Sequence, residues 1–116
     1  MKPNYHAGLA AEDTVIKAYQ NRGHEICGTR WRGSAGEIDV IADGVDGLVF
    51  IEVKRSKTFA QASLRVSPRQ QSRIYNTACE FLGTTGRSMD TQARFDVALV
   101  DGTGQVRILE NAFGQV

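Results

Sequence analysis

Two short segments of the sequence carry acidic residues at a spacing that favours metal-dependent chemistry. Asp39 lies in residues 37–43, and Glu52 lies in the β-branched, apolar residues 48–54. Residues 44–47, Gly-Val-Asp-Gly, form a turn signal between the two segments. If this turn joins antiparallel strands through two or four loop residues, paired positions sum to 91 (44 + 47). Asp39 is then expected directly opposite Glu52.

Side chains alternate between the faces of a strand, so Glu37 and Asp39 share a face with Glu52 and Lys54, and Glu37 is expected opposite Lys54. Two opposed carboxylates need either a shared proton or a cation between them. Mg²⁺ or Mn²⁺ meets that need, and such an ion acidifies bound water and neutralises charge on a phosphodiester. Lys54 could then orient that water and stabilise the pentacoordinate phosphorus. The alternative is a solvated strand face with ordinary ion pairs.

A helix is predicted over residues 5–22, ending at Gly23. Its apolar residues recur at the helical period: Tyr5, Leu9, Val15, Ile16 and Tyr19. Glu12 falls at the centre of this stripe, and burying an unpaired ionised group costs several kcal/mol. Glu12 is therefore expected to meet a cation, a metal-bound water or hydrogen-bond donors in a polar site. A salt bridge to a nearby arginine is the alternative.

A second helix is predicted to begin after Ser67 as its cap, with Pro68 at the first position, and to end at Gly83. Gln71 and Tyr75 lie on its inward spine with Ala78 and Leu82, opposite Arg69 and Arg73. If the helix began early, Arg65, Arg69 and Arg73 would form a ridge able to follow phosphates. The Ser67-Pro68 pair places Arg65 in the loop, and solvated surface arginines are the alternative.

Charge is unevenly distributed along the chain, whose net charge is +1. Between Lys54 and Cys79 there are six basic residues, including Arg55, and no acidic one, so the remainder sums to −5 (1 minus 6). This asymmetry favours one face suited to a polyanion. Trp31 lies between Arg30 and Arg32, a combination suited to base stacking and phosphate contact. A tryptophan in the core is the alternative.

Strands are also expected over residues 24–30, 94–100 and 105–109. The element order αβββαββ predicts one α/β domain over residues 1–116, with a mixed sheet flanked by helices. Cys27 and Cys79 belong to no ligand motif and are expected to be reduced and structural. Neither a signal peptide nor a membrane span is apparent, which favours a cytoplasmic protein without a membrane partner.

Three segments carry a family resemblance: Gly36-Glu37-Ile38-Asp39, Phe50-Ile51-Glu52-Val53-Lys54 and Arg94-Phe95-Asp96-Val97. From about Gly8 to Phe113 the chain resembles the YraN-like family of uncharacterised bacterial proteins. That family is similar to the PD-(D/E)xK nuclease superfamily and to archaeal Holliday junction resolvases. The resemblance implies a restriction-endonuclease-like core. It also implies metal ligation by Asp39, Glu52 and the Val53 carbonyl, with Lys54 as catalytic lysine and Glu12 as the helix-one acid.

The sequence departs from that pattern at two positions. Ile38 replaces the motif proline, and Gln70 stands where YraN-like relatives usually carry a lysine. Gln71 and Tyr75 resemble the QxxxY feature of nucleases related to the RecB exonuclease domain. The residues expected to contact nucleic acid are Arg30, Trp31, Arg32, Arg55, Arg69, Gln71, Arg73 and Tyr75.

The leading hypothesis is an endonuclease that depends on Mg²⁺ or Mn²⁺ and cleaves DNA, in particular branched, Holliday junction-like DNA. A homodimer would suit a two-fold junction. One alternative is a nucleic-acid-binding module with the nuclease fold and little or no catalysis. Another is a protein-interaction domain in which the acidic hairpin face is only structural.

Overall fold

A computed structural model describes residues 2–62 and 66–113, with the backbone alone for residues 2–7 and 61–62. Its elements, in chain order, are α1 (Lys2–Asn21), β1 (Glu25–Arg32), β2 (Glu37–Gly44), β3 (Gly47–Arg55), α2 (Phe59–Ala62), α3 (Pro68–Thr84), β4 (Ala93–Val100) and β5 (Val106–Leu109). The expected order αβββαββ is confirmed, with the one-turn helix α2 added in the loop after β3. The roles expected for the side chains of Tyr5 and Arg65 lie outside the described residues.

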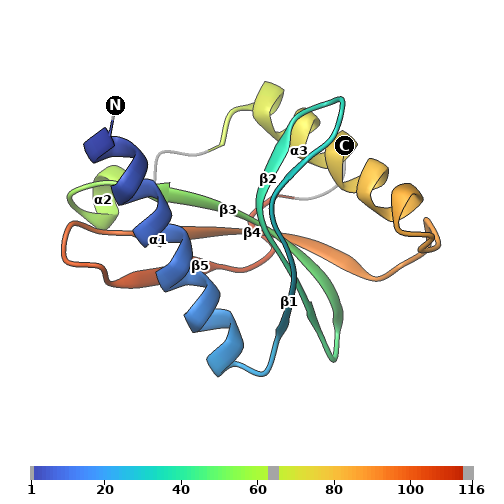
Figure 1. Ribbon diagram of the computed structural model, residues 1–116, viewed down its shortest axis with the longest axis horizontal. Helices are drawn as coiled ribbons and strands as arrows, with labels where there is room; N and C mark the ends of the chain where they lie inside the picture. Colours follow the sequence, from blue (N-terminus) through green and yellow to red (C-terminus); the bar gives the residue numbers. More distant parts are fainter. Residues whose placement is uncertain (1, 63–65, 114–116) are drawn as a thin grey trace.

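The strands form one mixed sheet in the order β1-β2-β3-β4-β5. Neighbouring strands run antiparallel except β3 and β4, which are parallel. Parallel neighbours need a crossover, and the chain passes from β3 through α3 to β4. Figure 1 shows α1 lying across the sheet and α3 running beside β2. This mixed sheet flanked by two helices is a restriction-endonuclease-like α/β fold.

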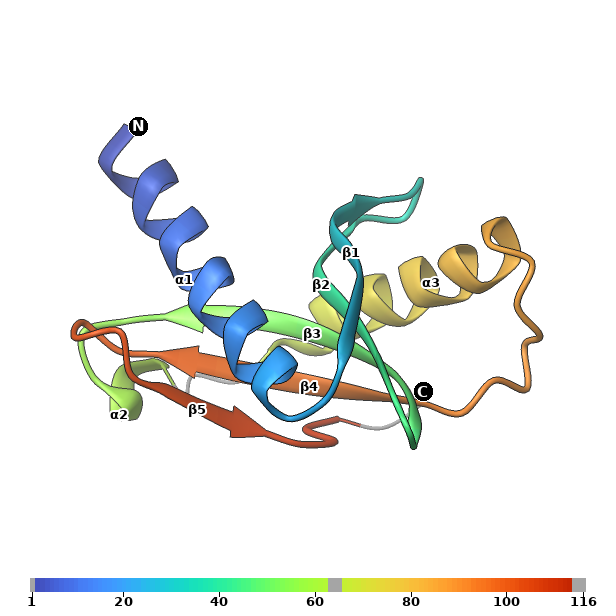
Figure 2. The same ribbon diagram turned by 60° about the horizontal axis from the view of Figure 1, so that its bottom comes forward.

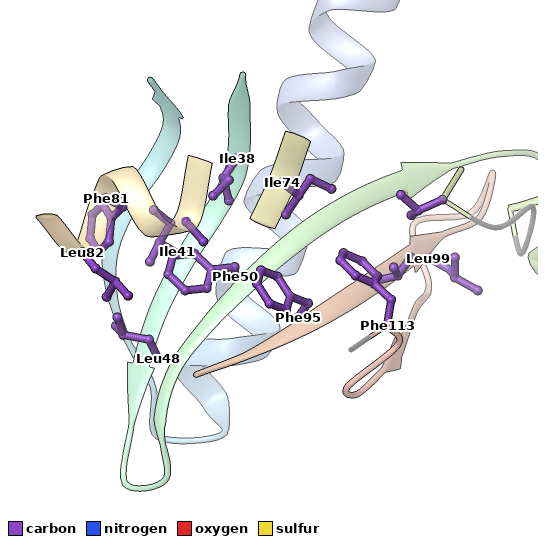
Figure 3. Close-up of a cluster of buried hydrophobic side chains, with 13 residues drawn as sticks. Ile38, Ile41, Leu48, Phe50, Ile74, Phe81, Leu82, Phe95, Leu99 and Phe113 are labelled. Carbon is purple, nitrogen blue, oxygen red and sulfur yellow. The ribbon is translucent and has the colours of Figure 1, made fainter. Parts of the chain in front are cut away.

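The alternation of side chains along β3 divides the hydrophobic core into two parts. Leu48 and Phe50 pack toward α3, whereas Val49 and Ile51 pack toward α1. The two helices supply the facing apolar side chains: Ile74, Ala78, Phe81 and Leu82 from α3, and Ala11, Val15 and Tyr19 from α1. In Figure 3, side chains of α3 lie over the aromatic residues of β3 and β4. The same alternation directs Glu52 to the α3 side of the sheet.

The β2–β3 hairpin has the register that the turn predicts. Pairing runs from Gly44 and Gly47 at the turn to Val40 and Ile51, with position numbers that sum to 91. Gly47 has φ of +115°, and a Cβ there would collide with the carbonyl oxygen of Gln92. Only glycine fits this close approach in the left-handed region. The turn thereby fixes which residues follow at the far end of the hairpin.

Beyond the last ladder pair, β2 and β3 separate. Figures 1 and 2 show the two strands leaving their common turn together and diverging toward the other end. Asp39 and Glu52 are the next positions, at the mouth of this split. The expected pairing of Glu37 with Lys54 is wrong, because the strands have already separated and Glu37 pairs with Arg32 of β1. The split opens a space beside the sheet into which polar side chains can point.

Two expectations about burial are also wrong. Ala11, Val15 and Tyr19 form the most buried line of α1, with at most 4% of each residue exposed. Glu12 therefore lies at the edge of the buried stripe, where it can pair with a cation and remain partly hydrated. Cys27, expected to be a buried structural thiol, is exposed, because it shares the exposed face of β1 with Glu25 and Thr29. Both cysteines of the chain are free.

Candidate active site at the split between β2 and β3

The Asp39 side chain accepts a hydrogen bond from the backbone of β3 at the point where the pairing of β2 with β3 ends. The Val53 N–H donates to Asp39 Oδ2 at 2.8 Å, so a side-chain oxygen satisfies a strand donor that the separated β2 no longer reaches. This bond holds the Asp39 carboxylate against β3. Asp39 lies beside Glu52 in the same cleft, and the charge of Asp39 acts on the Glu52 carboxyl group. The first two expected metal ligands are thus brought together.

Burial raises the pKa of both carboxyl groups. Burial and then the charge of Asp39 raise the pKa of Glu52 to about 8, although the Lys54 ammonium opposes the rise. Burial also raises the pKa of Asp39, against the effect of the Val53 N–H, and the charge of Glu12 adds to the rise. Burial and the neighbouring charge therefore disfavour the doubly ionised form of the pair. A cation placed between the two groups would favour that form.

Lys54 and Gln70 complete the polar cluster on the Glu52 side. The Lys54 ammonium lies 4.0 Å from Glu52 Oε2. Gln70 Nε2 donates to the same oxygen at 3.0 Å, and Lys54 Nζ donates to Gln70 Oε1 at a long 3.5 Å. Ser67 caps α3 by accepting from the Gln70 N–H at 3.1 Å, which fixes the first helical turn beside β3. Gln70 thus connects the carboxylate to the lysine.

Gln70 is a site residue that sequence reasoning did not place in the site. The sequence shows its departure from the lysine of YraN-like relatives, and its position three residues after the Ser67 cap places it in the first turn of the helix. What the sequence could not supply is the docking of that turn against Glu52. An amide serves both neighbours there, because it donates to the carboxylate and accepts from the ammonium.

An open cleft of about 340 Å³ exposes this cluster to solvent. Its lining consists of Ala35, Gly36, Glu37, Asp39, Glu52, Gln70, Arg73 and Ile74. The β1–β2 loop forms one wall, and Glu80 of α3 holds it there. Both oxygens of Glu80 accept from the Ser34 N–H, at 2.9 and 3.0 Å, and these bonds lower the pKa of Glu80. The cleft therefore has a fixed wall on the α3 side.

Glu12 of α1 forms the salt bridge to a nearby arginine that was the alternative to a metal-bound water or a polar site. Its Oε1 accepts from Arg30 Nε at 3.0 Å, and 18% of the Glu12 side chain is exposed. Over residues 8–60 and 66–113, no three His, Cys, Asp or Glu side chains gather closely enough to hold a metal ion. The cluster thus offers two adjacent carboxylates, with the third acid already paired to an arginine.

Those two carboxylates still fit a hard divalent cation. Mg²⁺ commonly takes one or two carboxylates and fills its remaining positions with water and substrate oxygens. The observation that supports the fit is that Asp39 and Glu52, both half-buried, line the same cleft, since two neighbouring carboxylates mark a position where positive charge is favoured. The Val53 carbonyl, on the same stretch of β3, could serve as a further oxygen ligand.

The arginines expected to contact nucleic acid are exposed, but they do not all lie at the cleft, since Arg55 lines a separate pocket beside α1. Arg73 lines it, and both Arg73 and Arg69 are exposed on α3. Arg32 is also exposed and lies 3.8 Å from Glu37 at the cleft wall. Arg55 is exposed at the end of β3. These four side chains can reach a polyanion without disturbing the core.

The other expected contacts are engaged in packing. Trp31 packs edge-on against Phe81 at a centroid distance of 5.3 Å and belongs to the α3-side core. Gln71 Nε2 donates to the Val66 carbonyl at 2.9 Å. Tyr75 packs against the core beside Phe95, with ring centroids 6.1 Å apart. Neither Gln71 nor Tyr75 lines the cleft that contains Asp39 and Glu52.

A second charge network, centred on the fully buried Asp96, lies on the α1 side, away from the cleft. Asp96 of β4 is 0% exposed and accepts from the Tyr19 hydroxyl at 2.6 Å and from Arg94 Nε at 3.0 Å. It also accepts from the Asn111 N–H at 2.9 Å. This network ties α1, β4 and the segment after β5 together, which accounts for the charged residues of the third family segment in structural terms.

The fold and the paired carboxylates define a restriction-endonuclease-like α/β protein. No helix in the described part of the chain is long and apolar enough to cross a membrane.

The model of the uncharacterised protein family UPF0102 matches residues 11–100, and the chain belongs to this family. It is the YraN-like family expected from the sequence. A UPF0102 protein of Ruegeria pomeroyi is 50% identical over 96% of this chain and 90% of its own length. One of Roseobacter denitrificans is 49% identical over 96% of this chain and 86% of its own length.

Proposed function

We propose that the protein is a divalent-metal-dependent endonuclease that cleaves DNA. The observation that carries the proposal is the pair of half-buried carboxyl groups, Asp39 and Glu52, which lie together in an open cleft with Lys54 beside Glu52. Such an arrangement costs stability unless a cation or a proton resolves it, and perturbed carboxyl groups in a cleft favour a functional site over a structural one.

Asp39, Glu52 and the Val53 carbonyl would hold the metal ion. When bound, Mg²⁺ or Mn²⁺ would lower the pKa of a coordinated water and neutralise charge on the phosphodiester. The Val53 N–H keeps Asp39 in place, and Gln70 orients Glu52. Lys54 supplies a positive charge beside the carboxylates, where it can stabilise the negative charge that develops on the attacked phosphate.

The exposed arginines around the cleft support DNA as the partner. Arg73 lines the cleft, Arg69 is exposed one helical turn before it, and Arg32 lies beside the cleft residue Glu37, whereas Arg55 lines a separate pocket beside α1. Neutralising backbone phosphates in this way supplies most of non-specific nucleic-acid affinity. Branched DNA as substrate, and a two-fold dimer acting on it, form the finer part of the proposal. That part rests on the resemblance to archaeal Holliday junction resolvases.

Cleavage and binding measured separately test the proposal. Single-stranded, duplex and four-way-junction DNA are incubated with the wild type in Mg²⁺ or Mn²⁺, beside Lys54→Ala and the double variant Arg69→Ala/Arg73→Ala. Lys54→Ala should lower the cleavage rate by about 10² or more and retain most DNA affinity, because it removes one transition-state contact. The double variant should weaken binding and reduce its salt dependence by about two phosphate equivalents.

The binding module without catalysis is the second candidate, and the Arg30–Glu12 ion pair favours it. In that pair the carboxylate of Glu12, the third acid, is bonded to Arg30, so two carboxylates are left for a metal ion. Wild-type protein that binds DNA and cuts no form of it in either metal would overturn the enzyme and support the module. Cleavage that is equal in the wild type and in Lys54→Ala would also count against the enzyme site.

A further inference from the structure

Glu12 and Arg30 form an ion pair in which the two residues differ in burial. The Glu12 carboxylate is the better buried partner, with 18% of its side chain exposed, against 35% for Arg30. The bond between them runs from Arg30 Nε to Glu12 Oε1 at 3.0 Å. A carboxylate that is held in a helix face and bonds the Nε of an arginine fixes the direction of the guanidinium plane.

The position of Arg30 in the sheet brings this guanidinium to the metal site. Thr29 pairs with Val40 and Trp31 pairs with Ile38, so Arg30 stands opposite Asp39 on the neighbouring strand. The ion pair is therefore joined to the strand position beside Asp39, one of the two carboxylates that would hold the metal, whereas Lys54 follows the other carboxylate on β3.

The backbone at Arg30 supports a role beyond ordinary packing. Arg30 has φ of +47°, in the left-handed region that glycine and asparagine adopt more readily. Such strain persists where the surrounding structure fixes it, and it concentrates at functional sites. At this position two adjacent side chains of β1 point to opposite sides of the sheet. Arg30 contacts Glu12 of α1, whereas Trp31 packs against Phe81 of α3.

We infer that Glu12 is a positioning residue and not a third metal ligand: it holds Arg30 beside Asp39 so that the guanidinium contacts a phosphate of the bound nucleic acid. The inference rests on the proposed function and names the phosphate contact of that same site. Cations would then flank the acidic pair on both sides, Lys54 on one and Arg30 on the other. An arginine suits this role because its planar donors match phosphate oxygens.

The test uses Glu12→Gln and Arg30→Asn, with Arg22→Asn as the matched control. Asparagine removes the guanidinium and tolerates the left-handed backbone, so the fold at residue 30 is preserved. Arg22 also forms an ion pair, 3.1 Å from Glu110, far from the cleft. Three quantities are measured: the affinity for Mn²⁺ by calorimetry, the salt dependence of DNA binding without metal, and the cleavage rate.

If Glu12 only positions Arg30, Glu12→Gln should keep the Mn²⁺ affinity within about threefold of wild type, whereas Asp39→Asn loses it. Arg30→Asn should reduce the salt dependence of DNA binding by about one phosphate equivalent, and Arg22→Asn should leave it unchanged. Both site variants should slow cleavage by about tenfold or more, and the double variant should be no slower than the worse single variant.

A loss of Mn²⁺ binding in Glu12→Gln as large as that in Asp39→Asn would overturn the inference and make Glu12 a ligand. An unchanged salt dependence in Arg30→Asn would overturn the phosphate contact. These readouts separate the inference from the proposed function. If the wild type cuts no DNA, the proposed enzyme fails, but the Mn²⁺ affinity and the salt dependence still decide between a ligand and a positioning residue. Wild-type protein that binds neither Mn²⁺ nor DNA would overturn both.

Discussion

Removing the charge of Glu52 should change how stability depends on pH. The pKa of Glu52 rises from 4.5 to about 8 through burial and the neighbouring Asp39 charge. A carboxyl group with a higher pKa in the folded chain than in the unfolded chain stabilises the fold fully below pH 4.5, and this stabilisation is lost as the pH rises through about 8. Glu52→Gln stays neutral at every pH and should not show this loss.

The size of the effect follows from the pKa difference. At about 1.4 kcal/mol for each tenfold change in proton affinity, the rise from 4.5 to about 8 corresponds to at most about 5 kcal/mol. This is a large fraction of the ~5–15 kcal/mol that stabilises a typical domain. Below pH 4.5 the wild type and Glu52→Gln should differ little in pH dependence, and above pH 8 the variant should be the more stable protein.

Urea unfolding at about pH 5, 7 and 9 measures this difference. Glu25→Gln, at an exposed position of β1, is the matched control. We expect the free energy of unfolding of Glu52→Gln to rise relative to wild type from pH 5 to about pH 8 and then to level off, whereas that of Glu25→Gln should remain parallel to wild type. Mg²⁺ added at pH 9 should recover stability in the wild type and not in Glu52→Gln, because the ion binds only the folded site. Parallel pH profiles for wild type and Glu52→Gln would refute the reasoning.

Three further substitutions have expected outcomes. Gln70→Lys adds a cation beside Glu52 and should lower the pKa of Glu52 by about one unit or more. The pH-dependent loss of stability should then end at a lower pH, which the same urea titration measures. Asp96→Asn removes the charge that Arg94 and Tyr19 bond in the core, so the free energy of unfolding should fall by about 3–5 kcal/mol, with Mn²⁺ affinity retained in the folded fraction. Glu80→Ala should release the loop wall, and amide exchange at Ser34 should accelerate while exchange in β3 stays slow.

The hairpin and the second helix were predictable because local rules decide them. The glycine turn at residues 44–47 sets the register, and the register places Asp39 and Glu52 together. Ser67 and Pro68 mark the start of α3 through a cap and a restricted backbone angle. Each of these signals acts within a few residues, so no knowledge of the tertiary fold was needed.

The incorrect and missing predictions concern contacts between distant segments. The split between β2 and β3 removes the expected pairing of Glu37 with Lys54, and the twist that produces it depends on the whole sheet. Glu12 was expected at the centre of the apolar stripe, but Ala11 occupies that line and Glu12 reaches Arg30 of β1 at its edge. Gln70 enters the site only because α3 docks beside β3. Periodicity along one helix carries no information about such partners.

A crystal soaked in Mn²⁺ and measured at a wavelength with anomalous signal from manganese tests the central claim most directly. We expect one strong anomalous peak between the carboxyl groups of Asp39 and Glu52, close to the Val53 carbonyl, and no such peak in crystals of Asp39→Asn treated in the same way. Glu12 should remain bonded to Arg30 in the soaked crystal. Soaked wild-type crystals with manganese only at other places, or with none, would contradict a metal site at the split between β2 and β3.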